Sequence, residues 1–335
     1  MRESGCGRDE VQAATGQVVA VDGVSFDVPE GAFFVVMGLS GSGKSTLIRC
    51  LNRLIEPTAG RVLIDGQDVT SLGAGELREL RRTRIGMVFQ HFALLPHKTV
   101  RQNVEFGLKI RGSDAEERRA AADEALDVVG LARWADYRPG ALSGGMKQRV
   151  GLARALASRT EILLMDEPFS ALDPLIRRDM QDEMLQLQRR FRKTVVFITH
   201  DLHEALHLGD RIAIMKEGRF VQVATPEEIV RAPGDPYVAA FTQDVDRGRV
   251  VTAAALMREP VSRHRAATTT VTAGAPLAEA YVACGEGLPV SVLDDTGRCV
   301  GALHPADVFA ELSRSPDAGQ PEVGCPQADR PSAAG

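Results

Sequence analysis

A short apolar strand followed by a glycine-rich phosphate loop constrains the fold of this chain more than any other feature. The loop runs Gly38-Leu39-Ser40-Gly41-Ser42-Gly43-Lys44-Ser45-Thr46 and fits the pattern G-x-x-x-x-G-K-[ST]. The apolar run Phe33–Met37 precedes it and predicts a strand buried in a parallel sheet. Backbone N–H groups of such a loop, and the helix that starts near Lys44, point at bound phosphate. We therefore expect nucleoside triphosphate binding, with Lys44 on the β- and γ-phosphates and Ser45 on Mg²⁺.

Alternating strand and helix patterns extend this unit into an α/β domain. Further strands are predicted at residues 61–64, 85–89, 162–165, 194–198, 211–215 and 219–223. Val24, Phe26 and Val28 alternate with polar residues and predict a half-buried strand. One helix carries apolar residues at helical spacing, which we interpret as core: Ile176, Met180, Met184, Leu187 and Phe191. The order of these elements predicts a mostly parallel sheet.

The chain divides into three parts by composition. We expect a nucleotide-binding domain over residues 1–245, in which residues of about 100–158 form a helical subdomain. A small α+β module is predicted over residues 251–312, with helices at 277–283 and 305–312 and strands at 289–293 and 299–303. Residues 313–335 are rich in Pro, Ser, Ala and Gly, which predicts a disordered tail.

Composition excludes several classes of protein. The 335 residues have a net charge of −5, which gives no reason to expect a nucleic-acid partner. No apolar run approaches the roughly 18 residues of a membrane helix, so any membrane role is expected to come through a partner. Five scattered cysteines without C-x-x-C spacing predict reduced thiols.

Two carboxylates after the strand at 162–165 complete a hydrolytic site. Asp166 ends that apolar run, where an aspartate that coordinates Mg²⁺ is expected. Glu167 follows directly, and hydrolysis needs a base or a water-orienting group beside the metal. The dipeptide Asp-Glu is common by itself, so the prediction depends on its position after a buried strand.

A second anion-binding helix start lies between these motifs. Leu142-Ser143-Gly144-Gly145-Met146-Lys147-Gln148 places a serine and two glycines at the beginning of a helix. A capped helix after a flexible turn would show the same pattern if it stood alone. Because one nucleotide needs one phosphate loop, a second cradle suits the γ-phosphate bound by another subunit. These residues resemble the signature of the ATP-binding cassette (ABC) family, usually Leu-Ser-Gly-Gly-Gln, with Met146 as a departure.

The resemblance implies roles for further residues. Gln90 resembles the glutamine that contacts Mg²⁺ and the attacking water, and His200 resembles the switch histidine that contacts the γ-phosphate. Ser170-Ala171-Leu172-Asp173 matches the segment that couples two sites, with Asp173 at the nucleotide. The implied catalytic set is Glu167, His200 and Gln90, and the implied Mg²⁺ ligands are Ser45, Gln90 and Asp166. The implied ATP-binding residues are Gly38, Ser40, Gly41, Ser42, Gly43, Lys44, Ser45, Thr46, Ser143, Gly144, Gly145 and Asp173.

Residues of about 9–250 resemble one ABC subfamily, the ATPase subunits of glycine betaine/proline importers. The similarity rests on Asn52-Arg53-Leu54-Ile55-Glu56-Pro57-Thr58, Met87-Val88-Phe89-Gln90 and Asp244-Val245-Asp246-Arg247. It implies an ATPase that forms a head-to-tail homodimer and powers import of quaternary amines. It also implies a membrane permease, an extracytoplasmic substrate-binding protein and a peripheral place on the cytoplasmic face of the inner membrane. Importers of another solute, such as methionine or a polyamine, and soluble ABC ATPases remain as alternatives.

Two further expectations follow from the resemblance. Relatives often carry paired CBS regulatory modules, and residues 251–312 resemble a single one, which either pairs across the dimer or is a spacer. The family's first strand, with the aromatic residue that stacks on adenine, is missing, since no Phe, Tyr or Trp precedes Phe26. Either the chain starts upstream of Met1, which we favour, or adenine lacks its platform, at a cost of about 1–2 kcal/mol in affinity.

Overall fold

The computed structural model describes residues 8–89, 93–259, 269–285 and 287–314. Its contacts divide the chain into two compact units, Met1–Val238 and Ala239–Gly335. The tail predicted at 313–335 lies outside the described residues except for its first two positions. The boundary predicted near residue 245 falls within the second unit, and the division into three parts stays a prediction.

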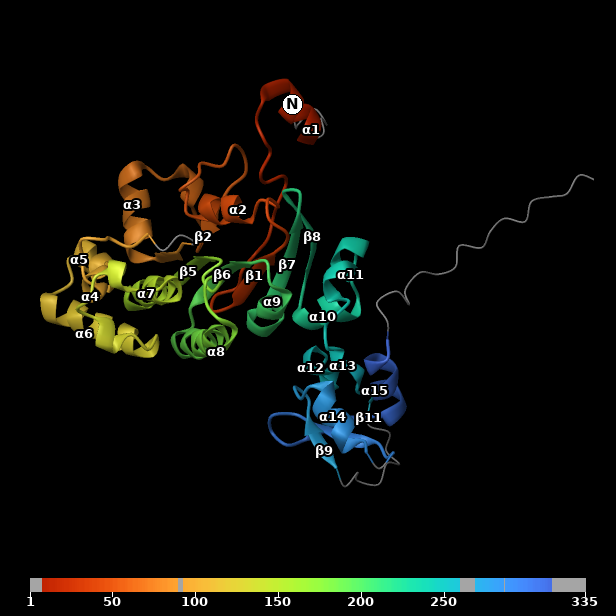
Figure 1. Ribbon diagram of the computed structural model, residues 1–335. Coiled ribbons are helices and arrows are strands. Elements are labelled where there is room, and N and C mark those ends of the chain that lie inside the picture. The colour runs from red at the N-terminus through yellow and green to blue at the C-terminus, as the bar shows by residue number, and fades with distance from the viewer. Residues whose placement is uncertain (1–7, 90–92, 260–268, 286, 315–335) are drawn as a thin grey trace, which may run out of the picture. The chain divides into compact units, whose positions relative to one another are not determined.

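A six-stranded sheet forms the centre of the first unit (Figure 1). Its strand order is β4-β5-β6-β1-β7-β8, and all neighbours are parallel except β7 and β8. The strands are β1 (Phe33–Met37), β4 (Ile85–Val88), β5 (Ile162–Asp166), β6 (Thr194–Thr199), β7 (Arg211–Lys216) and β8 (Arg219–Ala224), and a two-residue ladder joins β2 (Leu63–Ile64) to β3 (Gln67–Asp68). The mostly parallel sheet and its six predicted strands are confirmed, whereas the strand predicted at residues 61–64 is shortened to β2 and pairs only with β3.

Helices lie on both faces of this sheet and form most of residues 100–157. The helices between residues 8 and 242 are α1 (Arg8–Thr15), which lies apart from the sheet in Figure 1, α2 (Lys44–Leu51), α3 (Ala74–Thr83), α4 (Val100–Val104), α5 (Phe106–Arg111), α6 (Ala115–Val128), α7 (Gly144–Ala157), α8 (Pro174–Phe191), α9 (Leu202–Leu208), α10 (Pro226–Arg231) and α11 (Pro236–Thr242). Short 3-10 helices lie at Val69–Ser71, Ala132–Trp134 and Pro139–Ala141. None of the helices in the described part of the chain is long and apolar enough to cross a membrane.

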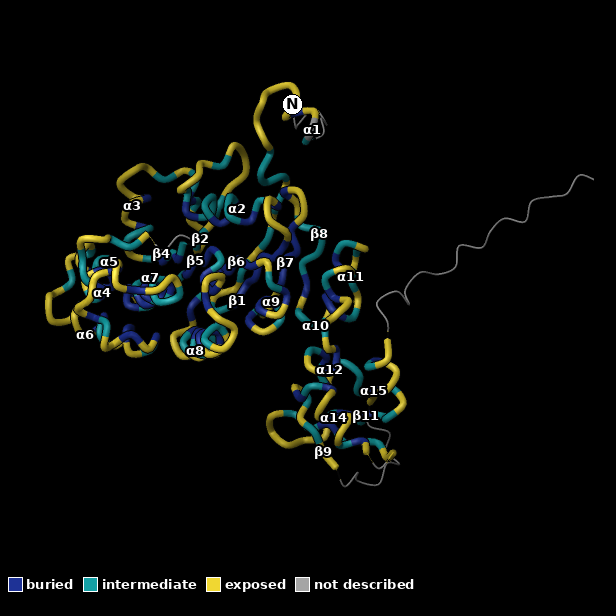
Figure 2. Tube along the Cα trace, viewed as in Figure 1, coloured by how far each residue is buried: buried dark blue, intermediate teal, exposed yellow. Residues whose placement is uncertain are grey.

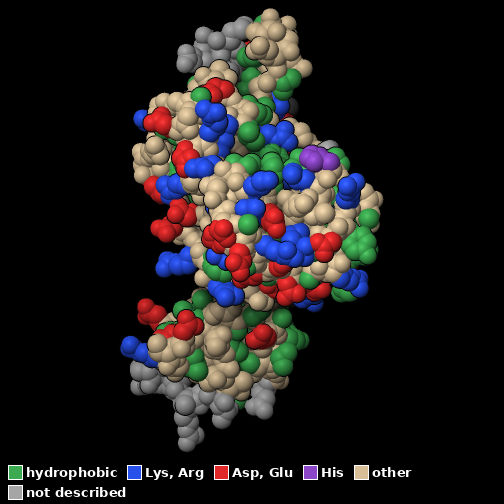
Figure 3. Space-filling view, turned by 90° about the vertical axis from the view of Figure 1, so that its left-hand side faces the viewer, with side chains coloured by type: hydrophobic (Ala, Val, Ile, Leu, Met, Phe, Trp, Pro, Cys, Tyr) green, Lys and Arg blue, Asp and Glu red, His purple; other side chains and the backbone are tan. Residues whose placement is uncertain are grey.

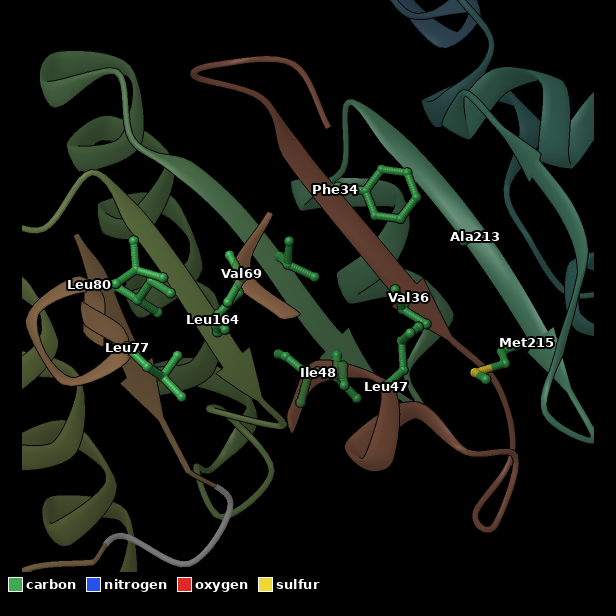
Figure 4. Close-up of a cluster of buried hydrophobic side chains, with 13 residues drawn as sticks. Phe34, Val36, Leu47, Ile48, Val69, Leu77, Leu80, Leu164, Ala213 and Met215 are labelled. Atoms are coloured by element: carbon green, nitrogen blue, oxygen red, sulfur yellow. The ribbon is translucent and has the colours of Figure 1, made fainter. Parts of the chain in front are cut away.

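The buried strand β1 explains why the phosphate loop is so firmly held. All five of its residues are buried, because β6 and β7 flank it and helices cover both of its faces (Figure 2). Phe34 and Val36 pack with Leu47 and Ile48 of α2 in the cluster drawn in Figure 4. Each such side chain contributes about 1.5–3 kcal/mol by leaving water. The strand before the loop and the helix after it therefore share one core.

Two predictions about secondary structure and packing were wrong in part. Residues 24–28 alternate in burial as expected, but they form no strand; Phe26 instead stacks on Phe34, with ring centroids 4.9 Å apart. That half-buried ring packs against the core cluster of the first unit. The side chain of Phe191 is 51% exposed, because the buried stripe of α8 ends at Gln188. Met180 and Met184 are buried as predicted.

The second unit is a small α+β module. Its sheet has the order β11-β10-β9, with β10 antiparallel to β11 and parallel to β9. Its elements are α12 (Arg247–Val250), α13 (Ala253–Leu256), β9 (Thr270–Thr272), α14 (Leu277–Ala283), β10 (Val290–Leu293), β11 (Cys299–Leu303) and α15 (Pro305–Leu312). Leu277, Val290, Val292, Leu303 and Val308 form its core. The predicted helices and β10 and β11 are present, whereas β9 was not predicted.

Candidate active site

The carboxyl ends of the parallel strands gather the predicted site residues at one edge of the sheet. The phosphate loop follows β1, Asp166 ends β5 with Glu167 directly after it, and His200 follows β6; these three strands are neighbours in the order β5-β6-β1. Ligands of open α/β sheets bind at this edge, because the loops that leave the strands there surround a crevice. The fold therefore brings together residues more than 100 positions apart in the chain.

Glycines are required at two points of the phosphate loop. Gly38 and Gly43 have φ angles of 154° and 106°, values that side chains of L-residues rarely adopt. A Cβ atom on Gly38 would overlap the carbonyl oxygen of Met215, and one on Gly43 would overlap that of Ala20. The loop therefore passes so close to its neighbours that only glycine fits.

Lys44 lies at the start of α2 with its ammonium group inside the loop. Its Nζ donates to the carbonyl oxygens of Gly38 at 2.8 Å and Leu39 at 2.9 Å. Burial lowers the pKa of Lys44, while the nearby carboxylates of Glu167 and Asp166 oppose that shift. Hydrogen bonds to the loop's own carbonyls hold the ammonium where the loop would place phosphate.

Ser45 and Asp166 form the oxygen pair that the metal prediction requires. The Ser45 hydroxyl donates to Oδ1 of Asp166 at 2.8 Å, and Asp166 is fully buried at the end of β5. Nη2 of Arg49 lies 3.4 Å from Oδ2 of Asp166. Hydroxyl and carboxylate oxygens suit Mg²⁺, which commonly takes one or two carboxylates and completes its shell with water and substrate phosphates. Among the described residues no cluster of three or more His, Cys, Asp or Glu could hold a metal.

Glu167 and His200 face each other beside this pair. Nδ1 of His200 lies 3.2 Å from Oε2 of Glu167, and the His200 side chain is 57% exposed while that of Glu167 is 15% exposed. Glu167 has a φ of 48°, a left-handed conformation that costs a residue with a side chain about 1–2 kcal/mol. A base held beside a metal carboxylate and a histidine can orient and deprotonate a water molecule that attacks a phosphate.

The signature serine and Asp173 cap helices in this chain. Ser143 is the N-cap of α7, where its hydroxyl accepts from Met146 N at 3.3 Å, and Asp173 caps α8 by accepting from Ile176 N at 3.1 Å. In the described residues, no hydrogen bond or ion pair joins residues 143–145 to residues 38–46. Their assignment to a nucleotide is therefore a proposal that needs a second subunit. Gln90 lies outside the described residues.

Sequence reasoning missed two arginines at this edge. Arg49 pairs with Asp166, and the spacing of five residues after Lys44 places it one and a half turns along α2. Arg177 of α8 donates to the carbonyl oxygen of Leu172 at 3.1 Å and lies 3.3 Å from Oδ2 of Asp201. It thereby joins the turn after β5 to the turn that carries His200. No local sequence pattern identifies either residue. Arg49 contacts an aspartate far away in the chain, and Arg177 contacts two different turns.

Known proteins match this chain along most of its length. A family model described as ABC transporter matches residues 21–170. The chain is 55% identical over 256 residues to the glycine betaine/carnitine transport ATP-binding protein GbuA of Listeria monocytogenes, a match that covers 76% of this chain and 64% of GbuA. It is 50% identical to the trimethylamine N-oxide transport system ATP-binding protein TmoW of Ruegeria pomeroyi, over 88% of this chain and 86% of TmoW. The chain belongs to the ABC transporter family.

A solved ABC structure has the same fold. The structure titled as a dimeric, post-hydrolysis state of the ATP-binding cassette MJ0796, bound to ADP and Pi, superposes with a TM-score of 0.59 at 40% identity. The match covers 62% of this chain and 90% of that cassette. The predicted P-loop ABC fold, and the resemblance to betaine-transport ATP-binding proteins, are therefore confirmed, whereas the CBS-like character of the second unit stays a prediction.

Proposed function

We propose that this chain is the ATP-hydrolysing subunit of an importer for glycine betaine, proline betaine or a related quaternary amine. The observation that carries the proposal is the pairing of Ser45 with Asp166, and of Glu167 with His200, at the mouth of the phosphate loop. In this proposal the first pair would hold the metal and the second would supply the base, both at the carboxyl end of β5. Mg²⁺ would be held by Ser45, Asp166 and Gln90, and would neutralise charge on the β- and γ-phosphates.

The proposed active form is a homodimer that closes on ATP. The similar MJ0796 cassette is described as dimeric, and residues 143–145 make no bond to the phosphate loop of their own chain in the described residues. In a head-to-tail pair, the signature of one subunit would face the nucleotide on the other, so ATP would act as part of the interface. Closure with ATP and opening after product release would then drive a partner through two conformations.

The permease and substrate-binding protein are proposed partners. GbuA and TmoW are named as transport ATP-binding proteins, and no helix in the described part of this chain could cross a membrane. Such a subunit would lie on the cytoplasmic face of the membrane and depend on a permease for contact with the solute. Figure 3 shows acidic and basic side chains interspersed on one face, without a continuous basic surface there.

Trimethylamine N-oxide is the second candidate solute. The TmoW alignment extends over 296 residues and is therefore longer than the first unit, so it includes part of the second. Betaines and trimethylamine N-oxide share a methylated cationic nitrogen, a shape that one type of binding protein can recognise through cation–π contacts. The solute itself is selected by partner proteins, so the chain supports a chemical class and no single compound.

Uptake measurements test this function. Cells that lack the subunit would be complemented with the wild type, with Glu167→Gln, or with Glu161→Gln, which changes an exposed carboxylate paired with Arg84 at the other end of β5. We expect the wild type and Glu161→Gln to restore uptake of radiolabelled glycine betaine at high osmolarity, and Glu167→Gln to fail. Restored uptake of trimethylamine N-oxide alone would select the second candidate. If neither the wild type nor an N-terminally extended chain restores uptake of glycine betaine or of trimethylamine N-oxide, the amine assignment would be discarded. Another solute, such as methionine or a polyamine, would then be favoured.

We also propose that residues 251–312 form a single CBS-like regulatory module. The small α+β unit found there has the β-β-α order that motivated the prediction. Deleting residues 251–335 should change the dependence of ATP hydrolysis on ionic strength. An unchanged salt dependence would assign sensing to another part of the transporter.

A further inference from the structure

Gln148 is a buried glutamine that joins the signature helix to the catalytic turn. It lies on α7 with only 2% of its surface exposed. Its Nε2 donates to the carbonyl oxygen of Glu167 at 3.2 Å, and its Oε1 accepts from the backbone N–H of Ala171 at 3.0 Å. Both ends of the side-chain amide are thus used on one short turn, residues 167–171, which we name the catalytic turn.

The residue that Gln148 contacts needs external support. Glu167 has a φ of 48°, which the backbone of a glutamate does not favour. Its N–H donates to the carbonyl oxygen of Ile198 at 3.0 Å, and its own carbonyl also accepts from the Ser170 hydroxyl at 3.0 Å. Strained conformations persist only where surrounding contacts determine them. The hydrogen bond from Gln148 supports this conformation from helix α7.

A second contact holds α7 against the same turn. A Cβ atom on Gly145 would lie 3.3 Å from the carbonyl oxygen of Ala171 and 3.3 Å from Cδ2 of Leu172. Gly145 belongs to the signature and lies three residues before Gln148, on the same side of the helix start. The first turns of α7 are therefore packed and hydrogen-bonded to the catalytic turn at two separate points.

We propose that Gln148 is a positioning residue for Glu167, through which the signature helix sets the orientation of the base. The inference rests on the proposed function, in which Glu167 acts on the water that attacks ATP. The helix whose N-terminus would face the partner's nucleotide then also holds the base of its own chain. Any shift of α7 on closure of the dimer is transmitted to Glu167 through one side-chain amide.

The expected effect falls on the chemical step. A displacement of a reacting group by about 1 Å can cost on the order of 10²-fold in rate. Gln148→Leu removes both hydrogen bonds, whereas Gln148→Glu keeps an acceptor for Ala171 N–H and loses the donor to Glu167. We expect each variant to lower kcat for ATP at least about tenfold and to leave KM within about twofold, because the phosphate loop is untouched.

The matched control is Gln188→Leu. Gln188 is also a buried glutamine on a helix, 6% exposed, and its amide donates to the carbonyl oxygen of Gly31, before the amino end of β1. Melting temperatures and steady-state ATP hydrolysis of the full-length variants would be compared. We expect Gln148→Leu and Gln188→Leu to lose similar stability, while only Gln148→Leu loses kcat.

A double substitution separates positioning from general damage. If Gln148 acts through Glu167, adding Gln148→Leu to Glu167→Gln should change the residual hydrolysis rate by less than about twofold, because the group it orients is gone. Equal losses of kcat in Gln148→Leu and Gln188→Leu, or a further tenfold loss in the double variant, would overturn the inference. Absence of hydrolysis by the wild type would overturn the proposed function and the inference together, whereas wild-type hydrolysis with an unaffected Gln148→Leu overturns the inference alone.

Discussion

Breaking the ion pair between Arg247 and Glu311 is expected to destabilise the second unit and to leave the stability of the first unchanged. Nη1 of Arg247 lies 2.7 Å from Oε1 of Glu311, and the two side chains are only 7% and 5% exposed. Removing one partner of a buried pair costs about 3–5 kcal/mol, because the remaining buried charge loses its opposite charge. The second unit, Ala239–Gly335, has fewer than 100 residues, and units of that size are stable by about 5–10 kcal/mol. One substitution therefore removes much of its stability.

Either partner of this pair can be removed. Nη1 of Arg314, a side chain that is 52% exposed, also lies 3.5 Å from Glu311. Arg247→Met and Glu311→Leu each remove the 2.7 Å contact. We expect both variants to be destabilised. The double variant should regain most of the loss, because apolar side chains of similar volume replace a buried pair at little cost.

Two optical signals follow the two units separately. Trp134 is the only tryptophan and lies in the first unit, so its fluorescence reports that unit, while far-ultraviolet circular dichroism reports both. During urea unfolding, Glu311→Leu should lose part of its dichroism at lower urea with the Trp134 transition unchanged. A loss below about 1 kcal/mol, or movement of both signals together, would refute the reasoning that the pair stabilises a separate unit.

Three further outcomes are expected. Gly43→Ala should weaken ATP binding at least about tenfold, because φ is 106° and a Cβ atom would overlap the Ala20 carbonyl; calorimetric titration would show this, and an affinity within twofold of wild type would contradict it. Ser143→Arg should abolish hydrolysis while ATP binding persists, since that serine would serve the opposite subunit; lost binding would contradict this. Burial raises the pKa of Glu204, which accepts from Thr199 Oγ1 at 2.5 Å, so the protonated form is favoured on folding and its contribution to stability is lost as pH rises through the raised pKa. The melting temperature of Glu204→Gln minus that of the wild type should therefore rise between pH 4 and pH 8. A difference that stays constant over this range would show that Glu204 does not titrate there.

Local patterns predicted the strands that lie beside the site. The apolar runs at 33–37, 162–165 and 194–198 became β1, β5 and β6 within a residue of their expected ends. Each of them is buried on both faces, and continuous burial leaves a continuous apolar run in the sequence. Because ligands of such sheets bind at the carboxyl ends of the strands, the sequence alone predicts that Asp166, Glu167 and His200 lie at one edge of the sheet.

Predictions from sequence patterns were wrong where a contact with a distant part of the chain determines the local structure or burial. Phe26 alternates with polar neighbours as a strand residue would, yet its segment forms no ladder and packs through the stacked ring on Phe34. Phe191 continues the apolar spacing of α8 but is exposed, while Gln181 and Gln188 on that helix are buried. Each glutamine has a hydrogen-bond partner far away in the chain, Glu204 for Gln181 and the Gly31 carbonyl for Gln188. A pattern of apolar residues counts these amides as polar and exposed, and only the fold shows the hydrogen bonds that allow their burial.

The position of Glu167 shows why the dipeptide Asp-Glu carries little information alone and much in this fold. Asp166 is the last residue of β5, and the N–H of Glu167 still bonds to Ile198 of the neighbouring strand β6. The left-handed turn at Glu167 then leads away from the strand, and its carboxylate lies 3.2 Å from His200 at the end of β6. Gln148 and Ser170 hold the carbonyl of the same residue from the other side. A glutamate after any other strand would lack these partners, so the catalytic role proposed for Glu167 depends on the strand order β5-β6-β1 and on the tight approach of α7, both of which are properties of the whole domain.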